Sequence, residues 1–283
     1  MKRKFSYDLW MKMHKLDITY TKNKKGAKGL RRVEIPDKYI YIGNEVFHGV
    51  IKLRELRLPA HCKYIGRNAF RGCNLEKSLT FPESVEFLMS GCFAQNAYLR
   101  KVTFPIALKR MDGEVFRDCS RLHTVIFHRD CQMKVIREES FRECGNLRYL
   151  ELPGGVKKIG RRAFYRCKQL EVLNLPSGLL SIEEEAFYFA GIKELMLPET
   201  LQVIGNSSFF KCNNLTYVRI PPSVRVIEKW AFHGCNRLKI MEILHDPEEM
   251  GEWITNKSTV IRCRKGSEVD GYCQRYGLQT EYV

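Results

Sequence analysis

The chain has 283 residues, of which 48 are Lys or Arg and 32 are Asp or Glu, giving a net charge of +16 at pH 7. This length suffices for two globular domains, and no apolar run approaches the roughly 18 residues of a transmembrane helix, so we predict no membrane span. The eleven cysteines are odd in number and loosely scattered outside one repeated position. They therefore argue against a disulfide framework and indicate thiols kept reduced, as in the cytoplasm.

Residues 1–29 are basic and amphipathic. Phe5, Leu9, Met13 and Leu16 recur at helical spacing, but the apolar core of a signal peptide is missing. We predict a docked N-terminal cap, with a mobile tail as the alternative. Residues 17–20 are a candidate for a degenerate first repeat.

From residue 30 onward, phenylalanines recur at nearly constant intervals. The successive gaps are 23, 23, 23, 25, 23, 23, 22 and 23 residues, between Phe47, Phe70, Phe93, Phe116, Phe141, Phe164, Phe187, Phe209 and Phe232. Such a period indicates one supersecondary unit stacked many times, which is a solenoid.

The first half of each unit has the pattern of a strand. Between residues 147 and 153, Leu150 and Leu152 alternate with Tyr149 and Glu151, as in a half-buried strand. A proline then ends the strand because it has no N–H to donate. A second short extended piece follows at residues 156–159.

The second half of the unit brings the chain back. Gly160 suits a sharp turn through its freedom at positive φ. Ala163, Phe164 and Cys167 follow at one-turn spacing, which predicts a short helical or 3₁₀ segment. In the 25-residue interval, His128 replaces the proline and two residues are added, so we predict a small bulge or loop there.

Six cysteines lie three residues after a repeated phenylalanine. They are Cys73, Cys119, Cys144, Cys167, Cys212 and Cys235. Ala190 and Val50 occupy the same position, which indicates a small apolar core group. Zinc is the alternative, but the sequence has no Cys-x-x-Cys or Cys/His cluster at ligand spacing, so we expect no metal and no cofactor.

These features together resemble the BspA-like branch of the leucine-rich repeat family, from Leu30 to about Ile243, because Pro, Gly, Phe and Cys fall in phase. The resemblance implies an α/β solenoid, a right-handed coil of about ten 23-residue repeats over residues 30–243, with N- and C-terminal caps at 1–29 and 244–283. In the last segment, residues 259–263 read as a strand, 267–277 as a short helix and 279–283 as a final strand. The resemblance also implies a cell-surface adhesin role, which needs an export signal.

The charge is unevenly distributed along the chain. Residues 1–170 hold 36 Lys and Arg against 17 Asp and Glu, a net of +19, whereas residues 171–283 hold 12 against 15, a net of −3. Stacked repeats predict a positive stripe from Arg71, Lys109, Arg110, Arg117, Arg142, Lys157, Lys158, Arg161 and Arg162. The alternative function is therefore binding of a polyanion, either nucleic acid or an anionic surface, although the same cations could simply solubilise the repeats.

The outward face of the predicted strands is mixed in charge with a few aromatic and apolar groups. Its candidate protein-binding residues are Arg57, Lys101, Tyr149, Met196 and Tyr217. Rigid solenoid surfaces of this composition suit protein interfaces, although a strand tyrosine often serves only cross-strand packing.

We find no catalytic constellation in the sequence. The glycines follow the repeat and form no phosphate-binding loop, and His48 and His233 occupy a position that holds Arg71 in another repeat. We therefore predict a non-enzymatic scaffold that binds an unidentified protein partner.

Overall fold

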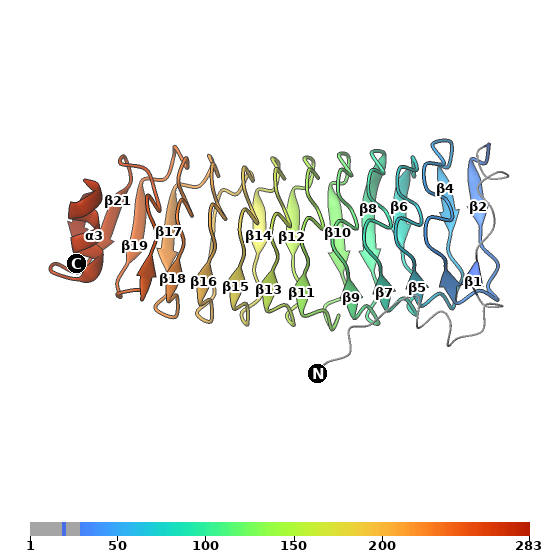
Figure 1. Cartoon of the computed structure of the whole chain (residues 1–283), viewed down its shortest axis with the longest axis horizontal. Coiled ribbons are helices and arrows are strands. Elements are labelled where there is room, and N and C mark those ends of the chain that lie inside the picture. The colour runs from blue at the N-terminus through green and yellow to red at the C-terminus, as the bar shows by residue number, and fades with distance from the viewer. Residues whose placement is uncertain (1–18, 21–28) are drawn as a thin grey trace.

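The computed structural model describes residues 19–20 and 29–283. The chain winds into about 11 parallel turns of about 23 residues, which we call rungs and which lie side by side along the long axis of the molecule (Figure 1). The predicted leucine-rich-repeat-like solenoid is thus confirmed. Its α/β label fits only loosely, because α3 (Glu268–Tyr276) is the single helix among the described residues.

The first strands of the rungs form one side of the coil, which we call the strand face. These strands are β2 (Arg32–Glu34), β4 (Glu55–Arg57), β6 (Lys77–Thr80), β8 (Leu99–Phe104), β10 (Thr124–Phe127), β12 (Tyr149–Glu151), β14 (Val172–Asn174), β17 (Tyr217–Ile220), β19 (Ile240–Ile243), β21 (Val260–Cys263) and β22 (Gln279–Tyr282). All their pairings are parallel, in the orders β2-β4, β6-β8-β10-β12-β14 and β17-β19-β21-β22.

The second extended pieces form two further parallel sheets. They are β1 (Thr19–Tyr20), β3 (Tyr41–Ile42), β5 (Tyr64–Ile65), β7 (Phe87–Leu88), β9 (Arg110–Met111), β11 (Val135–Ile136), β13 (Lys158–Ile159), β15 (Ser181–Ile182), β16 (Val203–Ile204), β18 (Val226–Ile227) and β20 (Glu249–Met250). The sheets run β1 to β9 and β11 to β20. The break between them follows the predicted loop, since no strand lies between Phe127 and Val135.

The nine repeated phenylalanines form a continuous ladder in the core. Neighbouring ring centroids are 4.9–5.8 Å apart with interplanar angles of 3–13°, and every ring is buried. Since a buried Phe removes roughly 150–250 Å² from water, this ladder contributes a large part of the hydrophobic stabilisation.

The return segment around each ladder phenylalanine is not helical, and the predicted helical or 3₁₀ turn is wrong. In the rung of Phe164, both Arg162 (φ 54°) and Arg166 (φ 57°) are left-handed. The amides of Arg162, Phe164 and Arg166 donate to carbonyls of the next rung. The amides of Ala163 and Tyr165 instead donate within local turns. A chain of turns alternating in hand therefore replaces the helix.

The turn glycine was predicted because glycine tolerates positive φ, and this reason is also wrong. Gly66, Gly160 and Gly205 are not among the residues at positive φ. A Cβ at Gly160 would lie 2.9 Å from the amide nitrogen of Glu138 on the preceding rung, closer than real Cβ atoms come. Glycine is needed here because the backbones of adjacent rungs approach each other.

The repeated cysteines are buried as predicted, and they also hydrogen-bond. All six donate their S–H to the carbonyl of the preceding rung's ladder phenylalanine at 3.1–3.4 Å. Asn96 holds the same position in its rung and donates Nδ2–H to the Phe70 carbonyl at 2.9 Å. Seven of the nine residues at this position thus donate a side-chain hydrogen bond that the sequence did not reveal, while Val50 and Ala190 fill it as small buried apolar groups.

The C-terminal end of the coil is covered by α3 and β22. Ser267 caps the start of α3 by accepting the Asp270 amide at 3.2 Å, and Gly277 ends it in the left-handed conformation at φ 62°. The Tyr272 hydroxyl accepts the Ile254 amide at 3.1 Å and donates to the Gly251 carbonyl at 2.9 Å. Backbone groups at the end of the stack thus find side-chain partners.

The division into segments 1–29, 30–243 and 244–283 stays a prediction, and the residues at helical spacing in the first segment lie outside the described ones.

Candidate functional site

Exposed apolar side chains run along the middle of the strand face. Ile126, Tyr149, Val172, Met196 and Tyr217 are 40%, 45%, 48%, 87% and 43% exposed. They come from five consecutive rungs and point outward because the alternate residues of each strand are buried. Ile126 lies two residues after Thr124, which pairs with Tyr149, and Met196 lies two residues after Glu194, which bridges to Val172, so these two occupy the next outward position of their strands. With rungs about 5 Å apart, the five side chains form a band two outward positions wide, which we call the apolar row.

The strand register explains how the row is assembled. Thr124 pairs with Tyr149, and Tyr149 with Val172. Val172 then forms an isolated bridge with Glu194, and regular pairing resumes only at Tyr217 in β17. The interruption falls in the 22-residue repeat, which has one residue fewer before the strand position. Met196 therefore lies outside any regular strand.

Each departure from the 23-residue period coincides with a hollow on the strand face. The loop after β10 borders a hollow of about 400 Å³ lined by Ile126, Phe127, Tyr149 and Pro153 among others. The short repeat opens a hollow of about 750 Å³ beside Met196. The register shift between Lys77 and Ser78 accompanies a third, of about 290 Å³. The two departures from 23 residues and the register shift thus account for three hollows on the strand face.

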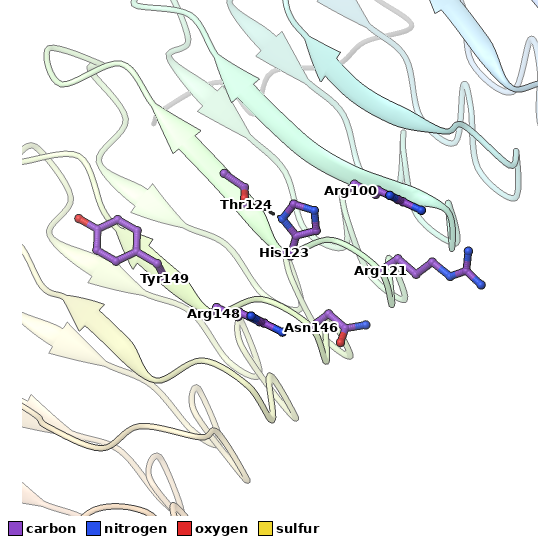
Figure 2. Close-up of a pocket in the computed structure, with 7 residues that line it drawn as sticks. All are labelled: Arg100, Arg121, His123, Thr124, Asn146, Arg148 and Tyr149. Atoms are coloured by element: carbon purple, nitrogen blue, oxygen red, sulfur yellow. Dashed lines mark hydrogen bonds between the residues drawn. The ribbon is translucent and has the colours of Figure 1, made fainter.

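A fourth hollow, which we call the basic hollow, lies where β8, β10 and β12 begin. It has a volume of about 650 Å³ and is lined by Arg100, Arg121, His123, Thr124, Asn146, Arg148 and Tyr149. Figure 2 shows these side chains coming from three neighbouring rungs, with His123 between Arg100 and Arg148. Its lining contains three guanidinium groups and no carboxylate.

The five predicted face residues have different surroundings. Tyr149, Met196 and Tyr217 fall within four consecutive rungs, in the apolar row. Lys101 is half-buried in β8, two rungs before Tyr149. Arg57 is four rungs from Tyr149 and is engaged by Glu34 and, at 3.2 Å, by Asp37. The structure brings three of the five together, whereas the sequence reading missed Ile126 and Val172 as members of the row.

Tyr149 is held in place by its neighbours. Its hydroxyl donates to Glu151 at 2.7 Å and accepts from the Asn174 amide group at 3.2 Å. The hydrogen bond to Glu151, together with partial burial and the negative charge of that carboxylate, raises the Tyr149 pKa. The ring is therefore presented outward in a fixed orientation, as a rigid contact residue requires.

Most of the predicted positive stripe is paired with carboxylates. Glu139, which is only 8% exposed, lies 3.2 Å from Arg117 and 3.0 Å from Arg142. Arg162 pairs with Glu185 on the next rung, and the hydrogen bond that it donates to that carboxylate raises the Arg162 pKa. In this part of the chain, the stripe is a ladder of ion pairs rather than a run of free charge.

The stripe cations beside the second strands divide into two groups. Three pair with carboxylates: Lys109 with Glu86 at 2.5 Å, Arg110 with Asp112 at 2.6 Å, and Lys158 with Glu183. Arg71 donates to Gln95 at 3.4 Å, and neither it nor Lys157 or Arg161 makes an ion pair with a described residue. Polyanion binding through this stripe therefore has few unpaired cations to rely on.

An outer aromatic column continues this stripe along the coil. Tyr165, Tyr188, Phe210 and His233 stack in succession with centroid distances of 4.8, 5.0 and 5.8 Å, and the Arg142 guanidinium lies 5.4 Å from the Tyr165 ring. Each of these residues follows a ladder phenylalanine directly. The sequence reading did not identify this column, although the shared position was its signal.

The cysteines give no sign of a metal centre. All eleven are free and buried, and no cluster of three or more His, Cys, Asp or Glu suited to a metal occurs among residues 19–20 and 29–283. Burial raises the pKa of Cys73 and Cys119 to about 12. Their thiols therefore stay protonated and act as hydrogen-bond donors.

The stacked rungs, the inward ladder and the outward strand face define a leucine-rich repeat solenoid. The sequence profile described as the BspA type leucine rich repeat region matches in six copies over residues 25–134 and 134–261. These matches cover most of the chain. The chain belongs to the BspA type leucine-rich repeat family.

Solved structures of bacterial proteins resemble the chain in fold. A leucine-rich repeat protein from Bacteroides ovatus is 21% identical, with a TM-score of 0.49 over 92% of this chain and 85% of that one. A leucine-rich repeat protein from Eubacterium ventriosum is 16% identical, with a TM-score of 0.51 over 90% and 66%. A leucine rich cell surface protein from Faecalibacterium prausnitzii is 20% identical, with a TM-score of 0.42 over 94% and 89%. At these identities the likeness concerns the fold alone.

No curated protein matches the chain in sequence. Among the residues that the structure describes, no helix has the length and apolar character needed to cross a membrane.

Proposed function

We propose that the protein is a non-enzymatic scaffold that recognises another protein through the middle of its strand face. The observation that carries this proposal is the row of exposed apolar side chains from Ile126 to Tyr217 on five consecutive rungs. Large outward apolar groups set among mixed charges favour a protein interface. The stacked rungs are rigid, so little conformational entropy is lost when they bind.

Site-specific photo-crosslinking tests this proposal. A photoreactive residue at Met196 reports contacts at the apolar row, and the same residue at Phe189, 36% exposed in a turn segment, serves as the control. In extracts of the native source, we expect a discrete protein adduct from position 196 and none from 189. The adduct should weaken by about tenfold or more with Tyr149→Ala, the loss expected for a contact that anchors an interface. Identical adducts from both positions would refute the strand face as the interface.

Binding of a polyanion remains the second candidate, supported by the net charge of +19 over residues 1–170. Titration of a labelled oligonucleotide at several salt concentrations tests it, since phosphate contacts give a steep salt dependence. Binding only near the millimolar range, with a shallow slope, would remove this candidate.

We propose the cytoplasm as the location, supported by eleven free thiols, because reducing compartments keep cysteines unpaired. The adhesin role implied by the family resemblance requires export instead. Fractionation of the native cells separates the two, because recovery of the protein in the cell-surface fraction would refute the cytoplasmic assignment.

A further inference from the structure

We propose that the basic hollow binds a short acidic segment of the protein partner, carrying two or three carboxylates. The cationic groups of the site are Arg100, Arg121 and Arg148, with Thr124 and Asn146 as additional hydrogen-bonding groups. This inference rests on the proposed function, because the hollow adjoins the apolar row on the same strand face (Figure 2).

The backbone fixes the spacing of the cations. Arg100, His123 and Arg148 occupy the same position on three successive rungs, and the His123 amide donates to the Arg100 carbonyl at 3.0 Å. Adjacent strands are about 5 Å apart, so Arg100 and Arg148 start about 10 Å apart. That span matches two or three residues of an extended peptide at about 3.3 Å each.

An ion pair lies on each side of these residues. On the N-terminal side, Arg54 pairs with Glu76 at 3.1 Å, and on the C-terminal side Lys193 pairs with Glu171 at 2.7 Å. Between these two pairs, Arg100, Arg121 and Arg148 form no ion pair with any residue from 29 to 283. An unneutralised cationic segment a few rungs long thus lies between these two ion pairs.

The flanking acids select the kind of anion. A polynucleotide following the rungs would run past the basic segment onto the Arg54–Glu76 and Lys193–Glu171 ion pairs, whose cations are already neutralised. A short acidic peptide fits between them. The guanidinium fork also matches the planar carboxylate, which it can bind through two hydrogen bonds.

The side chains are partly held before binding. The Arg121 guanidinium lies 4.6 Å from the centre of the Tyr98 ring, and the Arg148 Nε donates to Gln169 at 3.3 Å. A ring nitrogen of His123 is 2.8 Å from the Thr124 hydroxyl (Figure 2). Such contacts reduce the side-chain entropy lost on binding, which favours recognition of a discrete group.

The basic hollow also shares Thr124 and Tyr149 with the hollow of about 400 Å³ after β10, which is lined in part by Ile126 and Phe127. A partner segment with acidic residues next to an apolar residue would therefore fill both hollows at once. This pattern, acidic then apolar, is the partner chemistry that the surface favours.

A matched pair of variants tests the inference. Fluorescein-labelled hexaglutamate is titrated by anisotropy in about 10 mM salt, where the Debye length is about 30 Å. R121Q/R148Q removes two cations from the hollow. R237Q/K239Q removes two exposed cations from the same repeat positions, but on one rung, five rungs after Arg121 and four rungs after Arg148. Both doubles lower the net charge by the same amount.

We expect hexaglutamate to bind R121Q/R148Q at least about tenfold more weakly than wild type, and R237Q/K239Q within about twofold. Equal losses in the two doubles, or no binding by wild type above a hexaglutamine probe, would overturn the inference. Tighter binding of labelled hexathymidylate than of hexaglutamate, lost in R121Q/R148Q, would assign the hollow to nucleic acid and overturn it too. Crosslinking at Met196 uses neither probe, so failure here leaves the strand-face proposal standing.

Discussion

Replacement of one central ladder phenylalanine should loosen the coil locally. The Phe164 ring is completely buried and stacks on Phe141 at 5.4 Å and on Phe187 at 5.2 Å. Phe164→Ala removes this ring and leaves a gap between two others. Adjacent rungs cannot close it, because their spacing is fixed by backbone hydrogen bonds on both sides.

The expected loss of stability follows from burial and cavity formation. Removing a fully buried Phe costs about 3–5 kcal/mol in proteins generally. Each stacked aromatic pair adds about 0.5–1.5 kcal/mol beyond its area, and Phe164→Ala breaks two pairs. We therefore expect a loss near the upper end, about 4–5 kcal/mol.

Urea denaturation followed by circular dichroism measures the global effect. Because long repeat arrays can depart from two-state unfolding, amide hydrogen exchange should accompany it. Exchange should accelerate most for rungs next to Phe164 and least near α3, since each rung contacts only its neighbours. The control is Phe189→Ala, whose ring is 36% exposed and should cost less than about 1 kcal/mol. Equal costs for the two variants would refute the ladder as the main source of stability.

Three further predictions concern the end of the stack, the thiols and the rung spacing. Tyr272→Phe removes both hydrogen bonds of the hydroxyl and leaves the buried Ile254 amide unpaired, so it should cost about 1–3 kcal/mol and speed exchange at that amide; unchanged exchange would contradict the capping role. The Cys119 pKa is raised from 9.0 to about 12 in the folded state, so its contribution to stability is present below pH 9 and lost as pH rises. Between pH 8 and 10, wild type should lose about 1.4 kcal/mol more than Cys119→Ala, and parallel curves in urea titrations would disprove this. Gly160→Ala should cost about 1–3 kcal/mol through backbone crowding, whereas Gly154→Ala, with no atom within 4 Å of its Cβ, should cost less than about 0.5 kcal/mol; similar melting temperatures would argue against crowding.

The core was predictable because each rung repeats the same chemistry. Regular spacing of the phenylalanines implied stacking before any contact was known. The return segment was not predictable, because a spacing of three residues between Phe164 and Cys167 fits both a helical turn and a chain of tight turns. Arg162 and Arg166 adopt the left-handed conformation although neither is a glycine, the residue type that usually indicates it. Hydrogen bonds between rungs hold them in this conformation.

The site was predictable only in part. Alternation along each strand identified Tyr149 and Tyr217 as outward residues. The pairing of Glu139 with Arg117 depends on which residues 22–25 positions apart become neighbours, whereas Arg142 lies only three residues from Glu139. The same alignment creates the basic hollow from Arg100 and Arg148, which are 48 residues apart in sequence. Net charge therefore located the basic half correctly but could not say which cations would remain unpaired.

The return segments give one side of the coil an electrical direction. On each rung from Phe47 to Phe209, the amides of the ladder phenylalanine and of the residues two before and two after it donate toward the C-terminal end. Peptide dipoles aligned in this way add together, as they do in an α-helix. The second extended pieces donate the opposite way, to the preceding rung, as the amides of Glu183 and Gly205 do to the carbonyls of Ile159 and Ile182. On the return side the positive pole points toward the C-terminal end, whereas on the side of the second strands it points toward the N-terminal end. The two sides of the coil therefore present opposite backbone polarity to a partner, and their dipoles offset each other along the axis.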